Sequence, residues 1–130
     1  MKQEQLMDIL VLVKRIGNLF TEVEDLTNQL ADAVDRQDEV SINLVMSMRT
    51  DPIGKLAEAD HALRQQLTEL DEKDSVRIRE ILNGNVSAAL GETEQMLATQ
   101  AAQNIRNHKR LMEKDKIVNQ KITRDKSIYQ

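Results

Sequence analysis

Histidine and carboxylate side chains are the residues of this chain that could do chemistry, and one short motif places them at a useful spacing. Glu58-Ala59-Asp60-His61 has the Glu-x-x-His spacing with which di-iron carboxylate bundles hold metal inside a helical core. Such a site needs a second copy of the motif, but the other histidine, His108, is preceded at that spacing by Ile105. A single half-motif is typical of a solvated helix face, so we predict no metal site.

The rest of the sequence offers no other catalytic arrangement. It contains no cysteine, and no phosphate-binding glycine loop, nucleophile elbow or zincin motif occurs in it. Carboxylate runs such as Glu22, Glu24 and Asp25 fall at positions that the apolar pattern leaves facing water. We therefore predict that the protein is not an enzyme and uses no cofactor and no small-molecule substrate.

Long amphipathic helices account for almost the whole chain. Apolar residues at steps of three and four run from Leu6 to Val34, which predicts a first helix over about Lys2 to Arg36 with a coiled-coil-like seam. Gly17 lies inside this helix, either as a tolerated glycine or as a point of close approach. Asp38 is the expected N-cap of a second helix, which should run antiparallel to the first because the connection is short.

Pro52 lies within the second helix and leaves two alternatives. Proline costs about 3 kcal/mol inside a helix, so Asp51 could cap a new helix with Pro52 at its first position. However, the apolar residues from Val45 to Leu70 lie on one face of a single helix that continues through the proline, when a rotation of about 100° per residue is assumed. This phase favours a kinked but continuous helix over 38–71.

The second half of the chain predicts one short helix and one long helix. Asp74 or Ser75 is the expected N-cap of a short helix over Val76 to Leu82, and Asn83-Gly84-Asn85 is a strong stop signal. A last long helix is expected from Val86. The predicted fold is therefore all-α, an antiparallel bundle of three long helices with one short connecting helix and coiled-coil-like packing.

The helix lengths predict a C-terminal part that extends beyond the bundle. A last helix that starts near Val86 and matches a partner of about 34 residues would stop packing near residue 119. Residues 1–119 would then form the bundle, and 120–130 an extension of the last helix that can be mobile. Apolar residues still repeat here, which predicts a face with no partner in the bundle and a candidate binding site for a protein. The alternative is a frayed tail with no binding role. The residues of this face are Leu111, Val118, Ile122 and Tyr129.

Charge is unevenly distributed along the chain. Residues 1–103 carry 10 Lys and Arg against 19 Asp and Glu, whereas residues 104–130 carry 8 against 3. Acidic residues interrupt the basic segment and no series of aromatic residues accompanies it, which disfavours nucleic-acid binding. We expect the basic side chains to steer an acidic protein client. The expected residues are Arg110, Lys114, Lys121 and Arg124.

The sequence also bears on location. Its longest uninterrupted apolar run, Ile9 to Val13, is far shorter than the roughly 20 residues that span a bilayer. The first residues lack the pattern of a signal peptide. We expect a cytoplasmic protein without a membrane span.

Four segments carry a resemblance to a known family. They are Leu26 to Arg36 with the following Gln37-Asp38-Glu39-Val40, Met48-Arg49 with Ile53 to Leu56, Asn104-Ile105-Arg106-Asn107, and Leu111-Met112. The last two are similar to the Asn-x-x-Asn and Leu-Leu pattern in the final helix of the FlgN-like flagellar type III export chaperones. The resemblance implies a helical bundle that keeps hook-associated proteins export-competent. It also implies that the C-terminal part of the last helix binds the client, from Asn104 and Asn107 through Leu111 onward.

A structural role is the alternative to a chaperone role. The apolar stripes could instead build a homo-oligomer such as a homodimer, or an adaptor without a client, as in many coiled-coil proteins. In that case the C-terminal segment would have no client to bind.

Overall fold

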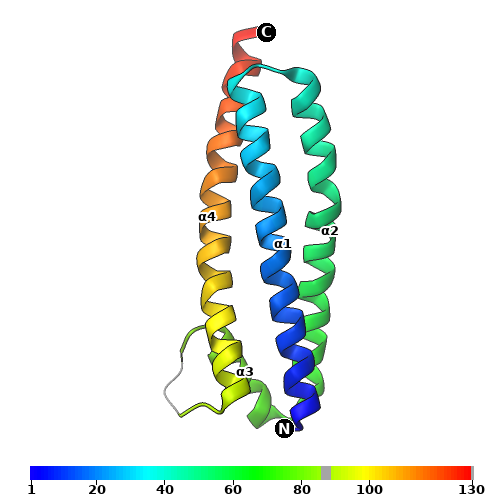
Figure 1. The fold of residues 1–130 in the computed structure, drawn as a ribbon, viewed down its shortest axis with the longest axis vertical. Helices are drawn as coiled ribbons and strands as arrows, with labels where there is room; N and C mark the ends of the chain where they lie inside the picture. Colours follow the sequence, from blue (N-terminus) through cyan, green and yellow to red (C-terminus); the bar gives the residue numbers. More distant parts are fainter. Residues whose placement is uncertain (86–88, 130) are drawn as a thin grey trace.

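Four helices make up the part of the chain that the computed structural model describes, which is the backbone of residues 1–85 and 89–129 and the side chains of residues 1–85 and 89–124. The helices are α1 (Gln3–Asp35), α2 (Glu39–Glu69), α3 (Glu72–Leu82) and α4 (Glu92–Tyr129). α1 lies between α2 and α4, and α3 packs at the end where the chain begins (Figure 1). The predicted all-α fold, with three long helices and one short helix, is confirmed. No helix in this part is long and apolar enough to cross a membrane.

The long helices run up, down and up, so α4 is antiparallel to α2 but parallel to α1 (Figure 1). Three polar contacts join α1 to α4 at a constant sequence separation of 86 residues, at 2.6, 3.0 and 2.8 Å. A constant separation is what two parallel helices in a fixed register produce. The contacts are Arg110 to Glu24, Lys114 to Asn28, and Lys121 to Asp35.

The α1 stripe supplies most of the core, which is divided into two clusters. The first cluster joins Leu6 to Leu19 of α1 with residues of α2, α3 and α4, among them the fully buried Ile78 and Leu97. The second cluster lies at the other end of α1 and contains Leu26, Leu30, Val34, Val45 and Val118. Apolar spacing along a single helix therefore organises both ends of the bundle.

The predicted entry to α2 and its continuity are confirmed. The Asp38 carboxylate accepts hydrogen bonds from the Ser41 backbone N–H at 3.1 Å and from its hydroxyl at 2.6 Å, which caps the helix. α2 then continues through Pro52 without a break. Pro52 is buried, and Val45 and Leu63 on either side of it both pack in the core. Core packing of the apolar stripe on both sides of Pro52 thus outweighs the local free-energy cost of the proline.

Two predicted helix starts are wrong. α3 begins at Glu72 rather than Val76, because the Asp71 carboxylate accepts the Asp74 N–H at 2.9 Å and takes the N-cap position. The predicted start of the last helix at Val86 lies outside the described residues, and α4 begins only at Glu92. There the Glu94 carboxylate accepts a hydrogen bond from the Gly91 backbone N–H at 3.1 Å. This bond satisfies one of the backbone donors that have no partner at the start of a helix.

The later start of α4 changes the end of the bundle. Lys121 still binds Asp35, the last residue of α1, and Ile122 packs against the second cluster. Contacts with the other helices therefore continue past residue 119.

Gly17 is a point of close approach between α1 and α4. A Cβ atom added there would lie 2.5 Å from Gln100 Nε2 and 2.7 Å from Asn104 Oδ1. These two side chains are joined by a hydrogen bond of 2.9 Å, and the buried Asn104 Nδ2 also donates to the Val13 carbonyl oxygen at 2.9 Å. The glycine leaves room for a polar clamp that holds α4 on α1.

We expect Gly17→Ala to lower the free energy of unfolding by about 1 kcal/mol. Disturbing a buried hydrogen bond costs about 1–3 kcal/mol, which exceeds the gain of about 1 kcal/mol in helix propensity. Gly54→Ala is the matched control, since Gly54 lies inside α2 with nothing within 4 Å of the added atom. It should stabilise the protein by about 0.5–1 kcal/mol. Urea denaturation measures both variants, and equal stabilisation by the two substitutions would contradict the clamp.

Candidate functional site

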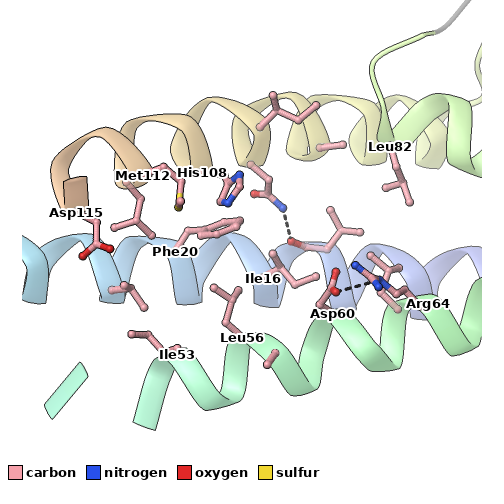
Figure 2. Close-up of a pocket in the computed structure, with 18 of the residues that line it drawn as sticks. Ile16, Phe20, Ile53, Leu56, Asp60, Arg64, Leu82, His108, Met112 and Asp115 are labelled. Carbon is pink, nitrogen blue, oxygen red and sulfur yellow. Dashed lines mark hydrogen bonds and ion pairs between the residues drawn. The ribbon is translucent and has the colours of Figure 1, made fainter. Parts of the chain in front are cut away.

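An open groove lies between α2 and α4 above the middle of α1. No Cα atom of α2 is within 8 Å of a Cα atom of α4 in the described residues, because both helices pack on α1 instead. The space between them has a volume of about 680 Å³. We call it the α2–α4 groove, and Figure 2 shows its side chains converging from the three long helices. It is lined by Ile16, Phe20 and Val23 of α1, Ile53 and Leu56 of α2, and Ile105 and Met112 of α4.

Side chains of different helices mark the two ends of the groove. Leu82 of α3 lines one end, because α3 has only 11 residues and covers α1 no further. At the other end Arg49 of α2 reaches across to Asp115 of α4, with 2.7 Å between Nη2 and Oδ1. The α4 side of the groove runs from Ala101 to Asp115, a distance of about 20 Å at 1.5 Å per residue. The groove thus has room for about four turns of a helix.

Three large apolar side chains are exposed along this groove. Ile53 is 44% exposed, Ile105 49% and Met112 55%. Ile105 and Met112 are seven residues apart and therefore lie two turns apart on one face of α4. Between them along α4, the His108 ring contacts the Phe20 ring of α1, with 5.4 Å between the two centroids (Figure 2). Such a gathering of exposed apolar side chains is typical of a surface that binds another protein.

Arg49 is the polar group that lies deepest at the end of the groove. Its side chain is only 13% exposed and its Nη2 is paired with Asp115, but its Nε is buried without a hydrogen-bond partner. A buried donor without an acceptor is costly and uncommon. Arg49 Nε therefore has no acceptor among the described residues.

The two edges of the groove differ in charge. On the α2 edge Arg64 and Asp60, which both line the groove, are paired with each other at 3.1 Å. On the α4 edge a shallow depression shares His108, Met112 and Asp115 with the groove. It continues over Lys109, Lys116 and Arg124, for which no ion pair is present among the described residues.

The predicted apolar face of the C-terminal segment is not free of partners, and this prediction is wrong. Leu111 is 7% exposed and Val118 only 2%, and Val118 packs with Leu26, Leu30 and Val34 of α1. Ile122 is half-buried against the same cluster. The side chain of Tyr129 lies outside the described residues. The face exists, but its partner is α1.

Three of the four predicted steering residues serve the bundle. Arg110 binds Glu24 through two hydrogen bonds of 2.6 and 3.2 Å. Lys114 Nζ donates to Asn28 at 3.0 Å, and Lys121 Nζ donates to Asp35 at 2.8 Å. These three side chains pair with α1 and do not line the α2–α4 groove, so the prediction that they face a client is not supported.

The two asparagines of the predicted binding motif have structural partners. Asn104 forms the clamp to Val13 and also lines the groove, as Leu111 does from the same helix. Asn107 Oδ1 accepts a hydrogen bond from Arg110 at 3.1 Å and so helps to orient that guanidinium toward Glu24. Of the eight predicted client-binding residues whose side chains the structure describes, only Asn104 and Leu111 line the groove.

Sequence reasoning missed Ile53, Ile105, Met112, Lys109 and Lys116 as site residues. The available signal was the spacing of seven between Ile105 and Met112 and between Lys109 and Lys116, which places each pair on one helix face. That spacing became informative only once the face of α4 that contacts α1 was known.

The residues that could have supported metal chemistry lie apart from one another. Glu58 and His61 are both exposed on α2, and His108 contacts Phe20 in the groove. No group of three or more His, Cys, Asp or Glu that could hold a metal ion is present in the described part of the chain.

Comparison with protein-family models, curated proteins and solved structures gives no match.

We expect the ion pair between Glu24 and Arg110 to make stability depend on pH. The hydrogen bonds from Arg110 hold the pKa of Glu24 below its ordinary value of 4.5. The contribution of the pair to the free energy of unfolding is therefore present above pH 4.5 and is lost as the pH falls through the lower folded-state pKa. Glu24→Gln should be less stable than the wild type at pH 7, and the difference should shrink on acidification toward pH 3.

Urea titrations at several pH values measure this difference. Glu22→Gln is the charge-matched control, since Glu22 is exposed on α1 and has no ion pair among the described residues. A difference between the wild type and Glu24→Gln that stays constant from pH 7 to pH 3 would show that the pair does not act in this way.

Proposed function

We propose that this protein is a cytoplasmic chaperone or adaptor that binds one amphipathic helix of a protein client in the α2–α4 groove. The observation that carries the proposal is the groove itself, in which Ile53, Ile105 and Met112 stay exposed above an apolar base. Amphipathic helices bind proteins by laying their apolar face into grooves of this kind. The role is one of binding and requires no catalytic residue.

The packing of the bundle supports a helix as the occupant. α1 contacts α2 on one flank and α4 on the other, while α2 and α4 stay apart. A helix placed between α2 and α4 would touch all three and complete a four-helix bundle. It would cover the apolar residues that α3 is too short to reach. The groove is thus the fourth position of a bundle whose other three positions are filled.

The resemblance to the FlgN-like export chaperones supplies the class of client. We propose hook-associated proteins of the flagellum, held soluble and export-competent until secretion. A client helix that is buried in the groove could not associate with other copies of itself, which is the physical benefit of such binding. The role of the last helix is retained in this proposal, but through its groove-facing residues Ile105 and Met112 rather than its C-terminal tip.

Deletion of the C-terminal segment after Leu111 is a poor test of this function. It would remove Val118 from the second cluster and Asp115 from its pair with Arg49. The bundle itself would lose stability, so loss of binding would have two explanations. Point substitutions at exposed positions of α4 avoid this problem.

We expect Met112→Asp and Ile105→Asp each to weaken binding of a purified hook-associated protein at least tenfold. A charge in an apolar interface loses its hydration without gaining a partner. Both side chains are about half exposed, so the melting temperature should change little. Isothermal titration calorimetry gives the affinity, and circular dichroism gives the melting temperature.

Ile117→Asp is the matched control, because Ile117 is 54% exposed on the same helix but does not line the groove. Wild-type affinity for Met112→Asp and Ile105→Asp would contradict the proposal. Light scattering tests the alternative, a structural homo-oligomer. If the groove is covered by a second copy of the chain, the wild type will be an oligomer that Met112→Asp converts to a monomer.

A further inference from the structure

We infer that the groove selects a helix with acidic residues along the edge that faces α4. This inference rests on the proposed function, and it names the chemistry of the occupant. It is carried by the charge difference between the two edges of the groove and by the unpaired donor of Arg49.

The α4 edge supplies cations that the bundle itself does not use. Arg110, Lys114 and Lys121 are occupied by Glu24, Asn28 and Asp35 of α1. The cations beside the groove are different residues, Lys109 and Lys116, which are exposed and have no ion pair in the described residues.

The two lysines have a defined spacing. They are seven residues apart, or about 10 Å along the helix axis, which matches carboxylates two turns apart on a docked helix. Arg124 adds a third cation farther along the same depression, where Glu113 is the one carboxylate besides the paired Asp115 among the residues whose side chains are described. The net charge of this edge is therefore positive.

The α2 edge offers no comparable preference. Besides Arg49, the charged side chains of α2 that line the groove are Asp60 and Arg64, which form an ion pair one turn apart. Such a pair is neutral as a unit and attracts neither sign strongly. An amphipathic helix in the groove would thus be attracted from one side only, which fixes which of its edges lies against α4.

Arg49 adds a second site for an anion or carbonyl acceptor. Its guanidinium lies at the end of the groove, shares one charge-assisted bond with Asp115, and has a buried Nε without an acceptor. Guanidinium groups form their strongest contacts with carboxylates through two donors. A turn of the Arg49 side chain toward the groove would let a carboxylate of the docked helix supply the acceptor that the buried Nε lacks. The position of Arg49 therefore favours an acidic residue at one end of the occupant as well.

Two designed peptides of the same composition test the inference. Each is an amphipathic helix of about four turns with leucines on one face. In the edge peptide, two glutamates seven residues apart lie beside the leucines. In the back peptide, the same glutamates lie opposite them. Binding to the full-length protein is measured by fluorescence anisotropy at low salt and at 1 M salt.

We expect the edge peptide to bind about fivefold more tightly at low salt, since two exposed ion pairs contribute this order of effect. The preference should disappear at 1 M salt, where the screening length is about 3 Å. The double variant Lys109→Glu/Lys116→Glu should lose the preference. The double variant Lys14→Glu/Lys73→Glu has the same net charge but changes exposed residues outside the groove, so it should keep the preference.

The possible failures separate the two proposals. Equal binding of both peptides, or a preference that survives Lys109→Glu/Lys116→Glu, overturns the acidic-edge inference while leaving helix binding intact. If neither peptide binds, or if Met112→Asp binds both as tightly as the wild type, then the groove does not bind helices. In that case the proposed function fails together with the inference.

Discussion

Burial of α1 from two sides is the constraint on which the rest of the structure depends. α2 and α4 each need a partner for their apolar stripe, and both find it on α1 rather than on one another. α1 can meet this demand because apolar residues occupy a wide arc of its surface, from Leu6 to Val34. Two helices on one central helix leave a gap between them, and α3 is long enough to fill only one end of it. The groove is therefore a direct result of how the helices share one partner.

The sequence was sufficient to predict the fold because the strongest signals in it are periodic or local. The α1 stripe gave the first helix to within a residue at each end, and Asp38 was recognisable as a cap from its position before an apolar run. The continuity of α2 through Pro52 could be predicted from the helical periodicity of its apolar residues, since Val45 and Leu63 must both reach the same surface of α1. In each case a residue type and its spacing determine the local structure without information about distant residues.

The site could not be predicted in the same way, because it depends on register between distant segments. The position of α4 relative to α1 is set by its start at Glu92 and by contacts such as that of Asn104 with Val13. An assumed start at Val86 placed the end of packing too early and left Ile122, which packs against the second cluster, outside the bundle. A step of one residue also turns a side chain by about 100°, which separates Arg110, bound to Glu24, from Lys109 beside the groove. Sequence could identify a basic amphipathic helix, but not which of its cations α1 would neutralise.

The parallel register of α1 and α4 has a consequence for the order of folding. The two helices touch at a sequence separation of about 86 residues, whereas α1 and α2 are joined by a three-residue turn. Closing a long loop costs more entropy than closing a short one, so the α1–α2 hairpin is the unit that can form first. During synthesis α1 emerges first and α4 last. Until α4 is complete, the cluster around Leu26 and Leu30 has Val45 of α2 but lacks Val118 and Ile122 of α4, so part of its apolar surface stays exposed while the chain grows.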